Sequence, residues 1–249
     1  MHRFVVAGVD GSWPALDAAR WAARAARRRE LPLTIVHACP AGPGVAVEQG
    51  REWLGEAGIE ARRLTGTPVR TGLRRGLPSE QLVLASGEAE TIVIGSRGLG
   101  GMTGLLLGSV ALALATHAHC PVVVVRGETP LADGPVVVGV DGSACGDAAV
   151  GFAFEEAASQ EAPLVAVRAS AGRVDLDEYL APWQAKYPDV TVRGELADDR
   201  PARAILRSAP DARLVVVGSR TSGPIGLGST SKALLRNADC PVAVTRAAE

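Results

Sequence analysis

The sequence contains the same unit twice, and this repeat limits the fold more than any other feature. The segment VVAGVDGS at residues 5–12 returns as VVVGVDGS at residues 136–143. Three further pairs follow in the same order: ELPLTIVHA (30–38) with EAPLVAVRA (161–169), TIVIGSR (91–97) with LVVVGSR (214–220), and CPVVVVR (120–126) with CPVAVTR (240–246). Four matches in one order indicate two homologous domains.

The length of the chain agrees with this division. Its 249 residues suffice for two domains of about 125 residues each, which is close to the usual domain size. The polar, turn-rich segment RGETPLADGP at residues 126–135 lies between the copies and has the composition of a linker. We therefore expect one domain at residues 1–128 and a second at residues 134–249.

Each copy alternates short apolar runs with amphipathic stretches. Continuous apolar runs indicate strands covered on both faces, as in a parallel sheet. Ser12 is a plausible N-cap, with Pro14 in the first turn of a helix whose apolar stripe includes Leu16. In the first copy, strands are expected at residues 4–9, 33–38, 68–73, 91–96 and 121–126. The predicted fold class is α/β, with two tandem doubly wound domains, each a five-stranded parallel sheet flanked by helices.

Composition excludes several classes of partner. The formal net charge is −1, which gives no whole-protein electrostatic attraction for nucleic acid or an acidic membrane. The basic run at residues 24–30 is expected to be the solvated end of a helix, where arginines suit the helix dipole. The longest apolar stretch, residues 105–115, is shorter than the roughly 20 residues that span a bilayer, so it predicts a buried helix.

The N-terminus and the cysteines both favour a cytoplasmic protein. The first residues enter a strand pattern at once, which leaves no room for a signal peptide. Four cysteines, without a C-x-x-C pair, predict reduced thiols. They are Cys39, Cys120, Cys145 and Cys240.

A glycine-rich loop, GSRGLGGMTGLLLGS at residues 95–109, follows the fourth predicted strand. It holds six glycines and no carboxylate, so an anion can approach its backbone. It runs into a predicted helix near Gly108 and Ser109, where unpaired N–H groups and the dipole favour a phosphate. The turn after the first strand carries Asp10. If these two strands are neighbours at the switch point of the sheet, both segments face one crevice.

Other nucleotide motifs are absent. The sequence has no G-x-x-x-x-G-K-[ST], which excludes a lysine-armed phosphate loop. No G-x-G-x-x-G follows the first strand, where a dinucleotide-binding fold requires it.

The spacing G-x2-G-x9-G-[ST] is met by Gly95, Gly98, Gly108 and Ser109. Together with the VDGS, IVHA and CPVVVV segments, it resembles the universal stress protein family in a tandem two-domain form. The resemblance covers nearly the whole chain and implies a fold like that of the adenine nucleotide α-hydrolases. It also implies a site for ATP or a related adenine nucleotide in the first domain.

The resemblance assigns parts of that site to numbered positions. Asp10 is expected at the nucleoside end, and the backbone of Ala38 beside the adenine. The ribose and phosphates would be held by Gly95, Gly98, Gly108, Ser109 and Val110, and the candidate site also takes in Gly11, Ser12, Ser96 and Arg97. Asp10 is the candidate ligand for a Mg²⁺ ion bound through the phosphates.

The second copy departs from this pattern. It keeps Asp141, Gly218, Gly228 and Ser229, but Thr221 stands where the first copy has Gly98. Between the outer glycines lie 12 residues in the first copy and 9 in the second, and the shorter loop has less reach. Threonine suits a positive φ poorly, and Pro224 removes one N–H donor. We therefore expect a degraded or empty site in the second domain.

The last strand of each copy is strongly apolar. VVVV at residues 122–125 and VAVT at residues 242–245 would each form a sheet edge, which aggregates unless it is covered. Pairing of the two edges within one chain would bury both, and the resemblance supports it because dimers of the family associate through this strand. A homodimer stays open as a further partner.

No set of side chains predicts catalysis. His117 and His119 are two residues apart and do not share a helix face, so they make a poor metal pair. His37 ends a strand, and ordinary packing is favoured over a nucleotide contact. A single carboxylate without a base or a basic clamp makes poor phosphoryl-transfer machinery, so any ATP hydrolysis is expected to be slow.

The function expected from these features is adenine-nucleotide binding in stress response or signalling. Three alternatives remain: an interaction protein without nucleotide, an enzyme of the adenine-nucleotide α-hydrolase or nucleotidyl-transfer type, and a protein that binds another ligand such as cyclic AMP. The S-G-G-x-D-S and H-x-G-H motifs expected of that enzyme class are absent.

Overall fold

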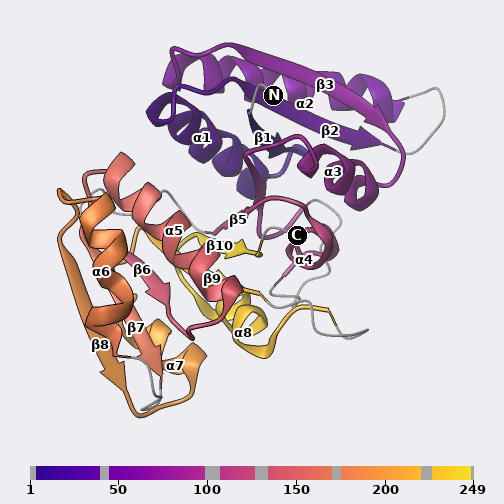
Figure 1. The fold of residues 1–249 in the computed structure, drawn as a ribbon. Coiled ribbons are helices and arrows are strands. Elements are labelled where there is room, and N and C mark those ends of the chain that lie inside the picture. Colours follow the sequence, from indigo (N-terminus) through magenta and orange to yellow (C-terminus); the bar gives the residue numbers. More distant parts are fainter. Residues whose placement is uncertain are drawn as a thin grey trace. The chain divides into compact units, whose positions relative to one another are not determined.

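The structure is a computed structural model that describes residues 4–39, 45–98, 107–126, 134–169, 175–219 and 226–247. The chain divides into two compact units, Met1–Thr129 and Pro130–Glu249. Each unit contains one parallel sheet with helices packed against it (Figure 1).

The first unit contains all five strands predicted for it. Its strands pair in parallel in the order β3-β2-β1-β4-β5, so strand order reverses between β1 and β4. In chain order its elements are β1 (Val5–Gly8), α1 (Trp13–Arg28), β2 (Leu33–Cys39), α2 (Val45–Leu64), β3 (Val69–Arg75), α3 (Pro78–Ser86), β4 (Thr91–Gly95), α4 (Ser109–His117) and β5 (Val122–Val125).

The second unit repeats this topology, with the parallel order β8-β7-β6-β9-β10. The doubly wound α/β fold predicted from the repeat is therefore confirmed for both units. The elements are β6 (Val136–Gly139), α5 (Ala144–Ser159), β7 (Leu164–Ala169), α6 (Leu176–Lys186), β8 (Val192–Ala197), α7 (Pro201–Arg207), β9 (Leu214–Gly218), α8 (Ser229–Asn237) and β10 (Val242–Thr245).

The core of the first unit is built from small aliphatic side chains. The central strands β1 and β4 are buried along their length, and the alanines of α1 pack against them. The second unit adds an aromatic cluster that the sequence pattern did not predict. Phe154, which is fully buried, stacks on Trp183 and Tyr187 with ring centroids 6.1 and 5.7 Å apart.

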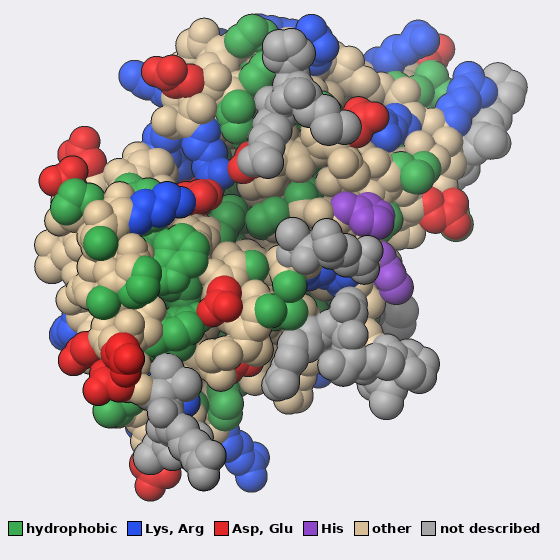
Figure 2. Space-filling view, viewed as in Figure 1, with side chains coloured by type: hydrophobic (Ala, Val, Ile, Leu, Met, Phe, Trp, Pro, Cys, Tyr) green, Lys and Arg blue, Asp and Glu red, His purple; other side chains and the backbone are tan. Residues whose placement is uncertain are grey.

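Surface features agree with the composition. On the face shown in Figure 2, basic and acidic side chains are interspersed rather than gathered by sign. The basic run at residues 24–30 closes α1 as predicted, with Arg28 over the ring of Trp21 and Arg29 paired with Glu90 at 3.8 Å. Within the part of the chain that the structure describes, every helix is too short or too polar to cross a membrane.

The last strand of each unit has one strand partner within its own unit. β5 pairs with β4, and β10 pairs with β9. The second edge of each strand is therefore not covered by a described strand of the same unit. Pairing of these two edges with each other stays a prediction.

The first helix of each unit begins at a capping serine. Ser12 accepts a hydrogen bond from Ala15 N at 3.4 Å, and Ser143 accepts one from Gly146 N at 3.2 Å. The N-cap predicted at Ser12, with Pro14 in the first turn, is thus confirmed.

Replacing either capping serine by alanine should lower the stability of its unit. We expect Ser12→Ala and Ser143→Ala each to reduce the free energy of unfolding by about 1 kcal/mol, because a helix N–H loses its acceptor. Urea unfolding measures the effect. Ser79→Ala is the control, since α3 begins without a side-chain cap. Equal losses in all three variants would contradict the capping role.

The cysteines should differ in reactivity. Burial raises the pKa of the Cys120 thiol to about 12 and that of Cys240 to about 11, whereas Cys145 is only partly buried. We expect an aromatic disulfide reagent at pH 8 to modify Cys145 first and to reach Cys120 and Cys240 only on unfolding. Rapid modification of a Cys145→Ser variant would contradict this order.

The same pKa shifts predict a loss of stability in alkali. Thiols of the unfolded chain ionise near pH 9, but the buried thiols do not. The free energy of unfolding should therefore fall as the pH rises from about 9 toward the folded-state pKa values. Urea unfolding across this pH range measures it.

Candidate functional site

The first unit contains a cavity of about 390 Å³ at the carboxyl ends of its central strands. β1 and β4 are neighbours in the sheet, so the turn after β1 and the loop after β4 meet at the switch point, as predicted. Eight of the predicted site residues line the cavity: Asp10, Ala38, Gly95, Arg97, Gly98, Gly108, Ser109 and Val110.

Asp10 lies where the two segments meet. Its Oδ1 accepts hydrogen bonds from Ser12 N at 3.1 Å and from Ser12 Oγ at 2.6 Å. A Cβ added at Gly98 would lie 2.1 Å from Asp10 Oδ2, so any larger residue at position 98 would displace the carboxylate. Ser12 Oγ also lies 3.4 Å from Arg97 O. Ser12 does not line the cavity, but it orients Asp10 beside the glycine loop.

Gly95 permits a close packing contact. A Cβ at this position would lie 2.6 Å from Pro14 C and 2.8 Å from Ala15 N. The end of β4 therefore lies directly against the first turn of α1. This contact brings the start of the glycine loop to the cavity.

Ser96 and Gly108 join the two ends of the glycine loop. Gly108 N donates to Ser96 O at 2.8 Å, and Ser96 is buried but does not line the cavity. Gly108 is the N-cap of α4 and provides no side-chain cap bond. Gly108, Ser109 and Val110 line the cavity, so the start of α4, with its unpaired N–H groups, belongs to the cavity wall. The predicted loop residues 99–106 lie outside the described residues.

The inner end of the cavity is apolar. Val36, Ile94 and Leu82 line it, and Leu82 approaches so closely that a Cβ at Gly8 would lie 2.9 Å from its Cδ1. The sequence reasoning missed Leu82 and Pro78, because α3 carries no motif and only its apolar pattern could have indicated them. An apolar end and a polar mouth are typical of a site for a small molecule.

Of the described histidines, His37 takes a structural position. His37 Nδ1 lies 2.8 Å from Val9 O, and its ring meets Trp53 edge-on with centroids 5.2 Å apart. His37 does not line the cavity, which confirms the preference for packing. His119 N donates to Ser86 Oγ at 2.9 Å. In the described ranges, no three His, Cys, Asp or Glu side chains form a metal-binding group.

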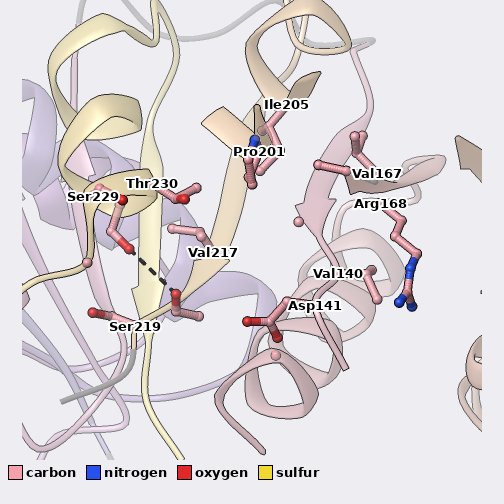
Figure 3. Close-up of a pocket in the computed structure, with 16 residues that line it drawn as sticks. Val140, Asp141, Val167, Arg168, Pro201, Ile205, Val217, Ser219, Ser229 and Thr230 are labelled. Carbon is pink, nitrogen blue, oxygen red and sulfur yellow. Dashed lines mark hydrogen bonds between the residues drawn. The ribbon is translucent and has the colours of Figure 1, made fainter. Parts of the chain in front are cut away.

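The second unit contains a corresponding cavity of about 350 Å³ (Figure 3). Asp141 Oδ1 accepts from Ser143 N at 3.0 Å and from Ser143 Oγ at 2.6 Å, which repeats the geometry at Asp10. Pro201 and Ile205 from α7 line the cavity, as Pro78 and Leu82 from α3 line the first.

The mouth of the second cavity is richer in hydroxyl groups. Ser229, Thr230 and Ser231 begin α8 and line it, where the first unit has Ser109, Val110 and Ala111. Ser231 Oγ lies 3.5 Å from Gly218 O. Thr221 and Pro224, on which the expectation of a degraded site depends, lie outside the described residues, so that expectation stays a prediction.

One buried cation distinguishes the second unit. Arg168 on β7 is buried, and its Nε and one terminal nitrogen have no hydrogen-bond partner among the described residues. It occupies the position of His37 in the repeat. Figure 3 shows its side chain directed away from Ser229 and Thr230, and Arg168 lines the same cavity.

Comparison with known proteins agrees with the predicted family and fold. The model of the Universal stress protein family matches residues 1–126 and 171–246. Universal stress protein Rv2005c from Mycobacterium tuberculosis is 36% identical over 284 residues, covering 97% of this chain and 96% of its own length. A relative from Mycolicibacterium smegmatis is 34% identical, with the same coverage.

A solved structure shows the same fold. A universal stress protein from Archaeoglobus fulgidus DSM 4304 superposes with a TM-score of 0.81 over 99% of both chains, at 21% identity. The structural likeness shows the fold, and the family is shown by the family model and the sequence relatives. The chain belongs to the universal stress protein family and contains two tandem domains of that family.

Proposed function

We propose that this protein binds ATP or a related adenine nucleotide in its first unit and acts in stress response or signalling as a binding module. The observation that carries the proposal is the convergence of Asp10, Gly98, Gly108 and Ser109 on one cavity. These residues come from segments far apart in the sequence, and only the neighbouring positions of β1 and β4 bring them together.

Different parts of the cavity suit the adenine, the ribose and the phosphates of a nucleotide. The apolar inner end, with Val36, Leu82 and the backbone of Ala38, suits the adenine ring. Asp10 is the acceptor for ribose hydroxyl groups. The N–H groups at the start of α4 suit the phosphates, because the helix dipole favours negative charge there.

A Mg²⁺ ion would be held mainly by the phosphates. Asp10 is the carboxylate that lines the described part of the cavity, and Mg²⁺ often binds through one carboxylate and phosphate oxygens. Arg97 is the one Lys or Arg that lines this part of the cavity. The described residues thus offer binding groups rather than an acid–base pair, and we propose binding with at most slow hydrolysis.

Removing the charge of Asp10 should weaken nucleotide binding. We expect Asp10→Asn to lower the affinity for ATP about tenfold to a hundredfold, because a hydrogen bond to a charged acceptor is lost. Isothermal titration of the full chain measures it. Gly98→Ala should weaken binding as well, since its Cβ would displace Asp10 Oδ2.

Asp141→Asn is the matched control for this experiment, because Asp141 makes the same turn in the second unit. It should leave the first-unit site unchanged. No binding of ATP by the unaltered chain, or an equal loss in Asp141→Asn and Asp10→Asn, would contradict the proposal. Mass spectrometry of small molecules released from the denatured protein distinguishes ATP from AMP and cyclic AMP.

Pairing of the two fifth strands is a further part of the proposal. An unpaired parallel edge leaves alternate N–H groups open to solvent. If β5 and β10 pair within one chain, every amide of Val122–Val125 and Val242–Thr245 should exchange slowly with deuterium in a monomeric sample. Fast exchange at alternate residues of either strand would contradict this arrangement.

A further inference from the structure

The first unit contains a second, smaller cavity that the nucleotide proposal does not use. Its volume is about 190 Å³, and Val9 is the one described residue that it shares with the larger cavity. Its wall is formed by the β1–α1 turn, the first turns of α1 and the middle of α2. The lining residues include Gly11, Ser12, Trp13, Leu16, Trp53 and Glu56.

Trp53 is a fixed wall of this cavity. Gly11 has φ +84°, and a Cβ at this position would lie 2.2 Å from atoms of the Trp53 ring, so the indole lies directly against the turn. His37 holds the same ring edge-on. The ring is therefore in place before any ligand arrives.

Trp13 is an unusual residue for an exposed helix start. It is 76% exposed, although an indole buries well and is rarely left in water. The second unit has Ala144 at the equivalent position, directly after its capping serine. Helix capping therefore does not require an aromatic residue here.

Glu56 gives the cavity a negative charge. It is exposed on α2 and lines the cavity. The nearby cations are engaged elsewhere, since Arg20 pairs with Asp17 and Glu60 at 3.0 and 3.4 Å, and Arg63 pairs with Glu60 at 3.2 Å. Glu56 has no ion pair with a described residue.

We propose that this cavity, which we call the indole pocket (Trp13, Trp53 and Glu56), binds a small quaternary ammonium compound. Indole rings attract cations through their π faces, and a quaternary ammonium group is weakly hydrated, so it leaves water readily. The Glu56 carboxylate supplies the opposite charge. An anion is disfavoured by that carboxylate, and a neutral apolar ligand would make no use of it.

The proposal is tested by titrating the full chain with choline while recording the NMR signals of the four tryptophan indole N–H groups. The signals of Trp13 and Trp53 should shift, while those of Trp21 and Trp183 stay in place. The neutral isostere 3,3-dimethylbutan-1-ol has the same shape without the charge. We expect choline to bind about threefold to tenfold more tightly than this alcohol.

Single substitutions identify the residues that bind choline. Trp13→Leu and Glu56→Gln should each weaken choline binding about threefold to tenfold. Glu48→Gln is the control, because Glu48 lies on α2 but does not line the pocket. Asp10→Asn should leave choline binding intact, which separates this result from that of the nucleotide proposal.

Three outcomes would overturn the proposal. Equal binding of choline and the alcohol would show a merely apolar pocket. Unchanged Trp13 and Trp53 signals at saturating choline would exclude the ligand class. Much tighter binding of a trimethyllysine peptide than of choline would assign the pocket to a protein partner instead.

Discussion

The adjacency of β1 and β4 is the constraint on which the first site depends. It places Asp10 so close to the glycine loop that a Cβ at position 98 would displace its carboxylate. Ser12 holds the carboxylate with two hydrogen bonds and also caps α1. The stability of the helix and the orientation of the candidate ligand group therefore rest on the same side chain.

The second unit repeats this turn geometry, but different side chains line its cavity. The turn at Asp141 and Ser143 reproduces the turn at Asp10 and Ser12. Around it, the second unit has hydroxyl groups at the start of α8 and a buried Arg168. A backbone frame that is fixed by turns and caps can thus carry two different sets of side chains.

Much of the fold could be predicted from the sequence, because its strands are continuous apolar runs and the first helix of each unit begins directly after a capping serine. Such signals depend on residues that are close in the chain. The inner wall at Leu82, the Trp53 contact with Gly11 and the stacking of Phe154 could not be predicted, since each needs a partner far away in sequence. Of the candidate site, the motif residues were predictable. Ser96 was also expected in the site, but it does not line the cavity and instead accepts a hydrogen bond from Gly108 N through its backbone carbonyl.

The bond from Gly108 to Ser96 ties the start of α4 to the end of β4. The two copies already differ there, with 12 residues between the outer glycines in one and 9 in the other. Insertions and deletions in this loop change the part of the site nearest the start of the helix, and the bound ligand can therefore change during evolution while the sheet and helices are kept.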